Sequence, residues 1–557
     1  MSFPNTEELF RKVGVRIETI KTGKFKDVGS MWRPMTEDER ALLQEVLGNV
    51  RESYPVGFIL SVLLVACALA TIGIWRLRIP QRWLEAPDDR RLRVRGAVAI
   101  AALAAALPLG IGDGRLEAVA DFENQYDREL SRNGVYSLVQ AFRNERLEYE
   151  TFYPTLERPV VFGRLRALLA GEDVHFLSDD PCDVTRRIEG RGEERRWNVI
   201  QITIESFSSK YTGCLGDGGG MTPEFDRLAQ DGLLFTNFIA TGTRTVRGME
   251  ALTLSLPPTP GSSLVKRPGH EDLFTLGSVF RTRGYDTAFL YGGYGYFDNM
   301  NHFFGSNGYR IVDRGTKPSE EVTFANIWGA CDEDLYRWVV DEADACASAG
   351  KAFHFFVMTC SNHRPYTFPE GRIDMPQGQR GSAVRYTDFA IGRLVEACRS
   401  RPWFANTLLV FVADHCASSA GRSEIPIHKY EIPLLFYNPA LVAPGRVDAL
   451  SSQMDYAPTL LGLLDWTYTS RFLGRDVIRD PAPDPLVLFG TYQKMAGRRG
   501  ERVAILQPKK RGDTYRWDPG PDVLTACEDR DLLDDTISMY QGASALIDEG
   551  RYGRIDR

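Results

Sequence analysis

Asn198-Val-Ile-Gln-Ile-Thr-Ile204 is a short, largely apolar and β-branched run that leads directly into Glu205. Thr407-Leu-Leu-Val-Phe-Val-Ala413 has the same character and leads into Asp414-His415. Runs of this length and composition are typical of strands buried in a parallel sheet. Open α/β sheets bind ligands just beyond the carboxyl ends of their strands. We therefore expect two carboxylates and one imidazole to meet at the same edge of a sheet.

Strands and helices alternate along the rest of the chain after residue 196. Further buried strands are predicted at 286–291, 353–359 and 434–437, and helices at 386–398, after Thr222-Pro223 and from Asp455. This alternation predicts an α/β fold with a mainly parallel sheet flanked by helices. After residue 501 we expect a short strand pair and a last helix near 534–547.

The loop Thr241-Gly-Thr-Arg-Thr-Val-Arg-Gly-Met-Glu250 supplies a hydroxyl that could complete the site. Thr245 is the candidate nucleophile, with Thr241 and Thr243 as competitors. Arg244 and Arg247 flank Thr245 and could hold phosphate oxygens.

A phosphodiester is a poor electrophile because its anionic oxygens repel a nucleophile, so its cleavage needs charge neutralisation and an activated oxygen. One divalent ion held by Glu205, Asp414 and His415, with the Thr245 hydroxyl, would supply both. Three hard oxygens and one imidazole suit manganese, which we expect, and also magnesium or zinc.

Several motifs resemble one known family. They are Glu205-Ser-Phe, Thr222-Pro-Glu-Phe-Asp, Ala240-Thr-Gly-Thr-Arg-Thr-Val-Arg-Gly-Met-Glu-Ala-Leu, Tyr296-Phe-Asp-Asn-Met-Asn301, Asn362-His-Arg-Pro-Tyr366 and Ala413-Asp-His-Cys-Ala-Ser-Ser-Ala-Gly. Over residues 120–555 the chain resembles the lipoteichoic acid synthase / phosphoglycerol transferase family of the alkaline phosphatase–sulfatase superfamily. The resemblance implies an alkaline-phosphatase/sulfatase-like sheet.

The same resemblance implies roles for individual residues. Glu205, Thr245, Asp414 and His415 would bind the metal, with Thr245 as the catalytic nucleophile. His363 would contact the substrate phosphate or aid proton transfer. In the Gram-positive synthases a tryptophan and an arginine bind the glycerophosphate, and Phe297 and Asn299 stand at those places here. The motifs are more similar to those of relatives from Gram-negative bacteria.

The first 112 residues have a different character from the rest. Residues 1–54 resemble a piece of the signal-peptide peptidase (protease IV) family that lacks the nucleophilic serine segment, so we expect this fragment to be inert. The apolar runs 55–74 and 96–111 are predicted to be two transmembrane helices, with an interfacial or buried helix as the alternative for the second. The arginine-rich loop between them is expected to be cytoplasmic.

These features predict five regions: 1–54, a signal-peptide-peptidase-like fragment; 55–112, two transmembrane helices; 113–195, an amphipathic linker; 196–500, an extracytoplasmic sulfatase-like catalytic domain; and 501–557, C-terminal strands and a helix. The expected location is the bacterial inner (cytoplasmic) membrane, with the catalytic domain facing the periplasm. The net charge of −7 and the absence of a basic stripe argue against binding to nucleic acid. No Cys-x-x-Cys pair occurs, which argues against a cysteine zinc site.

The function implied by the resemblance is transfer of glycerol phosphate from phosphatidylglycerol to an envelope acceptor through a threonine phosphodiester. A glycan or a glycerol-phosphate chain is the expected acceptor. The alternatives are a phosphoethanolamine transferase, a phosphodiesterase or sulfatase-type hydrolase of the same superfamily, and a non-catalytic envelope-binding protein.

Overall fold

The computed structural model describes residues 148–555, except 217–218, 419–422, 424 and 492. The fragment 1–54, both predicted transmembrane runs and the linker up to residue 147 lie outside the described residues. Within the described ranges, no helix combines the length and the apolar character needed to cross a bilayer. The domain boundaries given above remain predictions.

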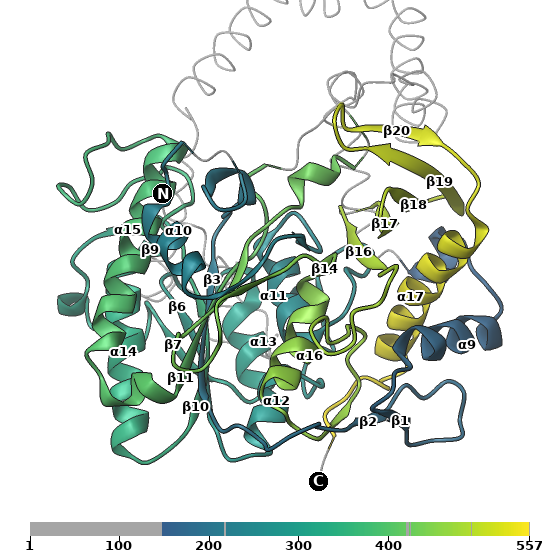
Figure 1. Cartoon of the computed structure of the whole chain (residues 1–557), viewed down its shortest axis with the longest axis horizontal. Coiled ribbons are helices and arrows are strands. Elements are labelled where there is room, and N and C mark those ends of the chain that lie inside the picture. Colours follow the sequence, from purple (N-terminus) through teal and green to yellow (C-terminus); the bar gives the residue numbers. More distant parts are fainter. Residues whose placement is uncertain (1–147, 217–218, 419–422, 424, 492, 556–557) are drawn as a thin grey trace, which may run out of the picture. The chain divides into compact units, whose positions relative to one another are not determined.

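An eight-stranded sheet organises the described part of the chain, in the order β13-β4-β12-β11-β3-β10-β6-β7 (Figure 1). The strands are β3 (Asn198–Ile204), β4 (Leu233–Phe235), β6 (Asp286–Tyr291), β7 (Arg310–Asp313), β10 (Phe353–Met358), β11 (Thr407–Ala413), β12 (Leu434–Tyr437) and β13 (Gly445–Val447). The predicted buried strands are confirmed, and every residue of β3, β10, β11 and β12 is buried.

Most neighbouring strands of this sheet are parallel, as the sequence predicts. The exception is β12, which pairs antiparallel with β11 and with β4. The sequence does not reveal this direction, because Leu434-Leu-Phe-Tyr437 is apolar on both faces whichever way the strand runs.

Helices cover both faces of the sheet (Figure 1). One face carries α10 (Pro223–Gln230), α14 (Asp332–Ser348) and α15 (Arg380–Arg399); the other carries α11 (Thr245–Leu254), α12 (Leu276–Arg281), α13 (Met300–Ser306) and α16 (Gln453–Leu463). The predicted helix 386–398 lies within α15, where Ile391, Leu394 and Cys398 form part of a buried stripe at helical spacing.

A second sheet of five antiparallel strands follows, with α17 (Arg530–Asp548) packed against it. Its strands are β16 (Val487–Gly490), β17 (Met495–Arg499), β18 (Arg502–Gln507), β19 (Arg511–Asp518) and β20 (Val523–Ala526). The last helix is confirmed, but three strands rather than a pair follow residue 501. The third strand was missed because β20 has no buried residue and so no alternating apolar pattern.

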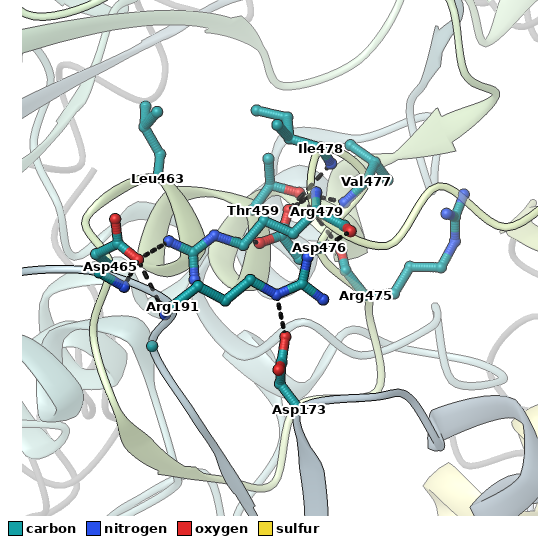
Figure 2. A network of polar contacts seen from close by, with 12 residues as sticks. Asp173, Arg191, Thr459, Leu463, Asp465, Arg475, Asp476, Val477, Ile478 and Arg479 are labelled. Atoms are coloured by element: carbon teal, nitrogen blue, oxygen red, sulfur yellow. Dashed lines mark hydrogen bonds and ion pairs between the residues drawn. The ribbon is translucent and has the colours of Figure 1, made fainter.

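The described segment before β3 packs on the C-terminal half of the chain. α8 (Tyr149–Phe152) and α9 (Arg158–Leu169) contact α17, and β1 (Val174–Phe176) and β2 (Arg186–Ile188) form a small sheet with β15 (Tyr468–Ser470). Figure 2 shows the polar network beside this sheet, in which the backbone N–H groups of Arg191 and Gly192 donate to Asp465 Oδ1 over 3.1 and 3.0 Å. Asp465 also pairs with Arg479.

Candidate metal centre and nucleophile

The two strand ends predicted to carry the metal ligands are direct neighbours. β3 and β11 pair in parallel, with Ile204 opposite Ala413, so Glu205 and Asp414 leave the sheet side by side. Two backbone N–H groups fix the Asp414 carboxylate: those of Ser206 and His415 donate to its Oδ1 over 2.8 and 2.7 Å. The sheet itself therefore positions both carboxylates.

Thr245 is the first residue of α11, and its hydroxyl faces these carboxylates. Thr245 Oγ1 donates to Glu205 Oε2 over 3.2 Å and lies 3.5 Å from His415 Nε2. The helix can come this close because residue 248 is glycine: a Cβ there would lie 2.3 Å from the Asp414 carbonyl oxygen. The structure thus brings together the four residues predicted from the sequence.

The donor atoms of this cluster suit a divalent cation. Ligand atoms of Glu205, Asp414 and His415 all lie within 4.8 Å of one another. His415 Nδ1 lies 2.7 Å from the Cys416 carbonyl, an acceptor, so Nδ1 carries the proton and Nε2 turns its lone pair toward the carboxylates. Asp414 Oδ2 is buried and accepts no hydrogen bond from the described residues, as expected of an oxygen available to a metal ion.

The protonation of the two carboxyl groups is strongly perturbed. Burial, followed by the charge of Glu205, raises the pKa of Asp414 well above its usual range. Burial alone would raise the pKa of Glu205 as well, but His415 and His363 outweigh it and lower that pKa. Two buried carboxylates this close repel each other, and a divalent cation between them would favour ionisation of both.

Gln453, the first residue of α16, was not identified from the sequence, yet it ties the two halves of the site together. Its amide nitrogen donates to the Ala413 and Asp414 carbonyls over 2.9 and 2.8 Å. Its Oε1 accepts from the backbone N–H of Thr241 over 2.9 Å, just before the nucleophile loop. It reaches this position because β14 (Ser451–Ser452) pairs with β5 (Phe238–Ile239).

Asn362 and Thr359, on the segment that follows β10, were also missed. Asn362 Nδ2 donates to the Glu205 carbonyl over 2.9 Å, and Thr359 Oγ1 accepts from the Glu205 N–H over 3.1 Å. Both hold the backbone of Glu205 rather than its carboxylate, so they position the ligand. Asn362 lies within the quoted Asn362–Tyr366 motif, which was the only sequence signal for it.

Arg244 and Arg247 lie in different environments. Arg244 is exposed beside Thr245, and no hydrogen bond or ion pair from a described residue holds its guanidinium. Arg247 is buried, forms a 2.8 Å ion pair with Glu250 and donates to the Thr259 carbonyl over 2.7 Å. Arg247 is therefore engaged in the core and unavailable to phosphate oxygens, whereas Arg244 is free to bind an anion.

The predicted substrate residues His363 and Phe297 both contact the ring of Trp328, which was not predicted. The Trp328 ring centroid is 3.8 Å from that of His363 and 5.5 Å from that of Phe297. His363 also acts electrostatically on Glu205, which places it near the metal centre. The side-chain amide of Asn299 donates to the Val265 carbonyl over 2.9 Å. Asn299 therefore contributes to this region by holding the backbone of Val265.

A cavity of about 390 Å³ lies elsewhere, among α9, β2, α16 and the segment 473–486. None of the four residues of the metal centre lines it. Its walls include the Asp–Arg network of Figure 2, in which acidic and basic groups neutralise one another. This cavity is therefore separate from the candidate metal centre at the strand ends.

Comparison with known proteins agrees with the geometry. Residues 197–466 match the Sulfatase family model, and residues 1–57 match Peptidase family S49. The chain is 26% identical over 312 residues to phosphoglycerol transferase I of Xanthomonas campestris pv. campestris (strain ATCC 33913), with 52% of this chain and 44% of that protein covered. It is 25% identical over 300 residues to lipoteichoic acid synthase 2 of Bacillus subtilis (strain 168), with 49% and 46% covered.

A solved structure extends the similarity beyond the matched domain. A protein of the alkaline phosphatase superfamily from Vibrio parahaemolyticus superposes with a TM-score of 0.68 at 28% identity, covering 72% of this chain and 99% of that one. The chain spans less than half the length of the two curated relatives.

Proposed function

Because the chain carries a sulfatase-family domain over residues 197–466, we propose that it is a metal-dependent phosphoglycerol transferase that takes glycerol phosphate from phosphatidylglycerol. One observation carries the proposal: the Thr245 hydroxyl lies at hydrogen-bonding distance from Glu205 and 3.5 Å from His415, within a cluster of metal-ligand type. The names of the relatives, phosphoglycerol transferase I and lipoteichoic acid synthase 2, support the choice of donor.

Glu205, Asp414 and His415 would hold one divalent ion, with manganese as the proposed metal. Such an ion would neutralise phosphate oxygens and lower the pKa of the Thr245 hydroxyl. The protein supplies the geometry: Ser206 and His415 N–H groups fix Asp414, and the Cys416 carbonyl fixes the His415 tautomer.

In the first proposed step, Thr245 Oγ attacks the phosphorus of phosphatidylglycerol. An Oγ–P bond forms, the P–O bond to diacylglycerol breaks, and the Thr245 proton is released to solvent water. His363 protonates the departing diacylglycerol oxygen. Its Nδ1 lies 3.1 Å from the Arg364 carbonyl, which leaves Nε2 for proton exchange.

In the second step an acceptor hydroxyl attacks the same phosphorus. His363 takes the hydroxyl proton, the new P–O bond forms, the Oγ–P bond breaks, and the Thr245 oxygen regains a proton from solvent water. We propose that Arg244 and the first N–H groups of α11 attract the phosphoryl oxygens in both steps. We propose an envelope glycan or a glycerol-phosphate chain as the acceptor.

The proposed location is the bacterial inner membrane, with the catalytic domain facing the periplasm. This proposal rests on the two apolar runs and the arginine-rich loop between them in the sequence. A lipid donor would then lie in the membrane to which the enzyme is anchored.

The test uses the purified full chain in detergent micelles, with manganese and fluorescent phosphatidylglycerol. We expect release of labelled diacylglycerol that chelation abolishes and added manganese restores. Thr245→Val should abolish release, because it removes only the hydroxyl. Thr243→Val is the matched control, because it alters a nearby threonine of the same loop, and it should retain release.

Three outcomes would overturn the proposal. Turnover of phosphatidylethanolamine in place of phosphatidylglycerol would make the enzyme a phosphoethanolamine transferase. Free glycerol phosphate formed at the same rate with and without an acceptor glycan would make it a hydrolase. Undiminished release by Thr245→Val would remove Thr245 as the nucleophile.

A further inference from the structure

A second cluster of metal-ligand residues lies outside the metal centre. His270 and Glu271 are in the loop before α12, and His302 is in the first turn of α13. His270 Nε2 lies 2.7 Å from His302 Nδ1 and 3.9 Å from Glu271 Oε1. One ligand atom from each of the three residues lies within 4.8 Å of the others.

His270 is held in the orientation that a metal ligand needs. Its side chain is buried (3% exposed), and its Nδ1 contacts the Arg267 carbonyl. Because a carbonyl only accepts, Nδ1 carries the proton and Nε2 presents its lone pair to His302. Metal-binding histidines are typically oriented by this kind of bond from the second ring nitrogen. Asn307 fixes the backbone as well, with Nδ2 donating to the His270 carbonyl over 2.7 Å.

The carboxylate of Glu271 lies beside the two imidazoles, with its Oε1 3.9 Å from His270 Nε2. A hydrogen bond between the two imidazoles would use one lone pair and one proton and leave this carboxylate without a role. A cation would use all three groups.

We propose that His270, Glu271 and His302 form a second metal site, separate from the metal centre at the strand ends, for a zinc ion or a similar transition-metal ion. Two imidazoles and one carboxylate are a typical ligand set for zinc with an open fourth position, at bond lengths of roughly 2.0–2.2 Å. His302 and Glu271 are exposed, so both side chains can turn to bring their ligand atoms to these lengths around the fixed His270.

The position of the site suggests what the ion does. The segments 265–270 and 298–302 already meet at two other points: Asn299 donates to the Val265 carbonyl, and Lys266 Nζ lies 2.6 Å from Asp298 Oδ1. An ion between His270 and His302 would fasten the same two segments at a third point. The site would therefore act as a structural clamp on α13 and on the turn that precedes it.

The experiment measures zinc bound per chain by equilibrium dialysis of the purified full chain, with its affinity tag removed. The background variant is Glu205→Gln with Asp414→Asn, which disables the metal centre at the strand ends. We expect one zinc ion per chain in this background and none after the further change His302→Ala. His302 is exposed, so the substitution leaves the fold intact, and circular dichroism checks this.

His428→Ala is the matched control, because His428 is also exposed and its Nδ1 lies 2.7 Å from Asp522 Oδ2. This variant should keep the zinc ion. Glu271→Gln should weaken binding about tenfold or more by removing a charged ligand. Zinc binding that is absent from the background variant, unaffected by His302→Ala, or unchanged in Glu271→Gln would refute the three-ligand site.

Discussion

The two ends of α16 lie beside buried acidic groups that differ in how their charge is balanced. At its start, Gln453 binds the Asp414 carbonyl beside Glu205 and the proposed nucleophile. Just past its end, Asp465 anchors the network of Figure 2. A helix of this length separates the two regions by about 16 Å.

The two regions differ in how the acids are compensated. No lysine or arginine among the described residues pairs with Glu205 or Asp414, and the pKa of Asp414 is raised. Asp465 is different: burial alone would raise its pKa, but its pairing with Arg479 lowers it. A buried carboxylate that pairs with an arginine, such as Asp465, stabilises the fold. Buried carboxylates without such a partner, such as Glu205 and Asp414, can instead bind a cation.

The largest expected effect comes from Asp414→Asn. The amide oxygen can still accept from Ser206 and His415, but one negative ligand is lost. We expect activity on phosphatidylglycerol to fall about a thousandfold or more. In the presence of a chelator, the melting temperature should stay the same or rise, because a buried charge near Glu205 is removed.

Turnover assays and thermal unfolding of the full chain in detergent test both parts. Manganese titration followed by dialysis adds a direct measure of metal affinity, which should fall with activity. A melting temperature several degrees below that of the unaltered chain would show that Asp414 serves the fold, and the contrast between the two ends of α16 would fail.

Asp465→Asn should produce the reverse pattern. The variant keeps a polar side chain at a residue with a φ of 60°, a conformation that asparagine tolerates, but loses the charge that pairs with Arg479. Because the pair is largely buried, we expect a loss of about 2 kcal/mol in stability. Turnover per folded molecule should not change, because Asp465 lies at the far end of α16.

Asp531→Asn is the control for this change. Asp531 also pairs with an arginine, Arg164, over 3.2 Å, but its side chain is 84% exposed. An exposed pair of this kind contributes little, so its melting temperature should match that of the unaltered chain. Equal losses in Asp465→Asn and Asp531→Asn would mean that burial does not set the strength of these pairs.

The sequence predicts that Glu205 and Asp414 lie together because the sheet itself brings them together. Apolar runs mark β3 and β11, and parallel pairing then brings Glu205 and Asp414 to one edge. Gln453 and Trp328 could not be predicted in this way. Gln453 and Trp328 each come from a part of the chain that is distant in sequence from the groups they contact. A local sequence pattern does not reveal which distant backbone group or ring such a side chain contacts.

Arg244 and Arg247 differ in a way that helical spacing in the sequence indicates. Both were predicted to hold phosphate, yet Arg247 lies on the buried face of α11 and pairs with Glu250. Residues three apart face each other on a helix, so this partner was visible in the sequence. The helix predicted after Thr222-Pro223 is α10, but the group that stabilises its first turn was not predicted. Thr222 stands at the cap position without capping, and Asp388 of α15 accepts the Glu224 and Phe225 N–H groups instead.

Asp388 is a third kind of buried acid: the N-terminus of α10 holds its carboxylate, with Arg385 at a longer distance of 3.8 Å, and it gives the smallest effect. Burial raises its pKa to about 6, although the two N–H donors oppose this. The unfolded chain releases the proton near 3.9. The folded state therefore holds a proton that the unfolded state has lost, and stability falls as the pH rises from about 4 to 6, by about 3 kcal/mol.

Asp388→Asn cannot ionise, so its stability should lack this part of the pH dependence. At pH 4 it should be less stable than the unaltered chain by about 1 kcal/mol, since an amide can accept only one of the two bonds well. At pH 7 the order should reverse, because only the unaltered chain then carries a buried charge. Thermal unfolding between pH 4 and 7 would show the two curves crossing. Parallel stability curves for the two proteins would mean that the N–H groups of α10 stabilise the Asp388 carboxylate as fully as Arg479 stabilises that of Asp465. Helix N-termini and cations would then compensate buried charge equally well.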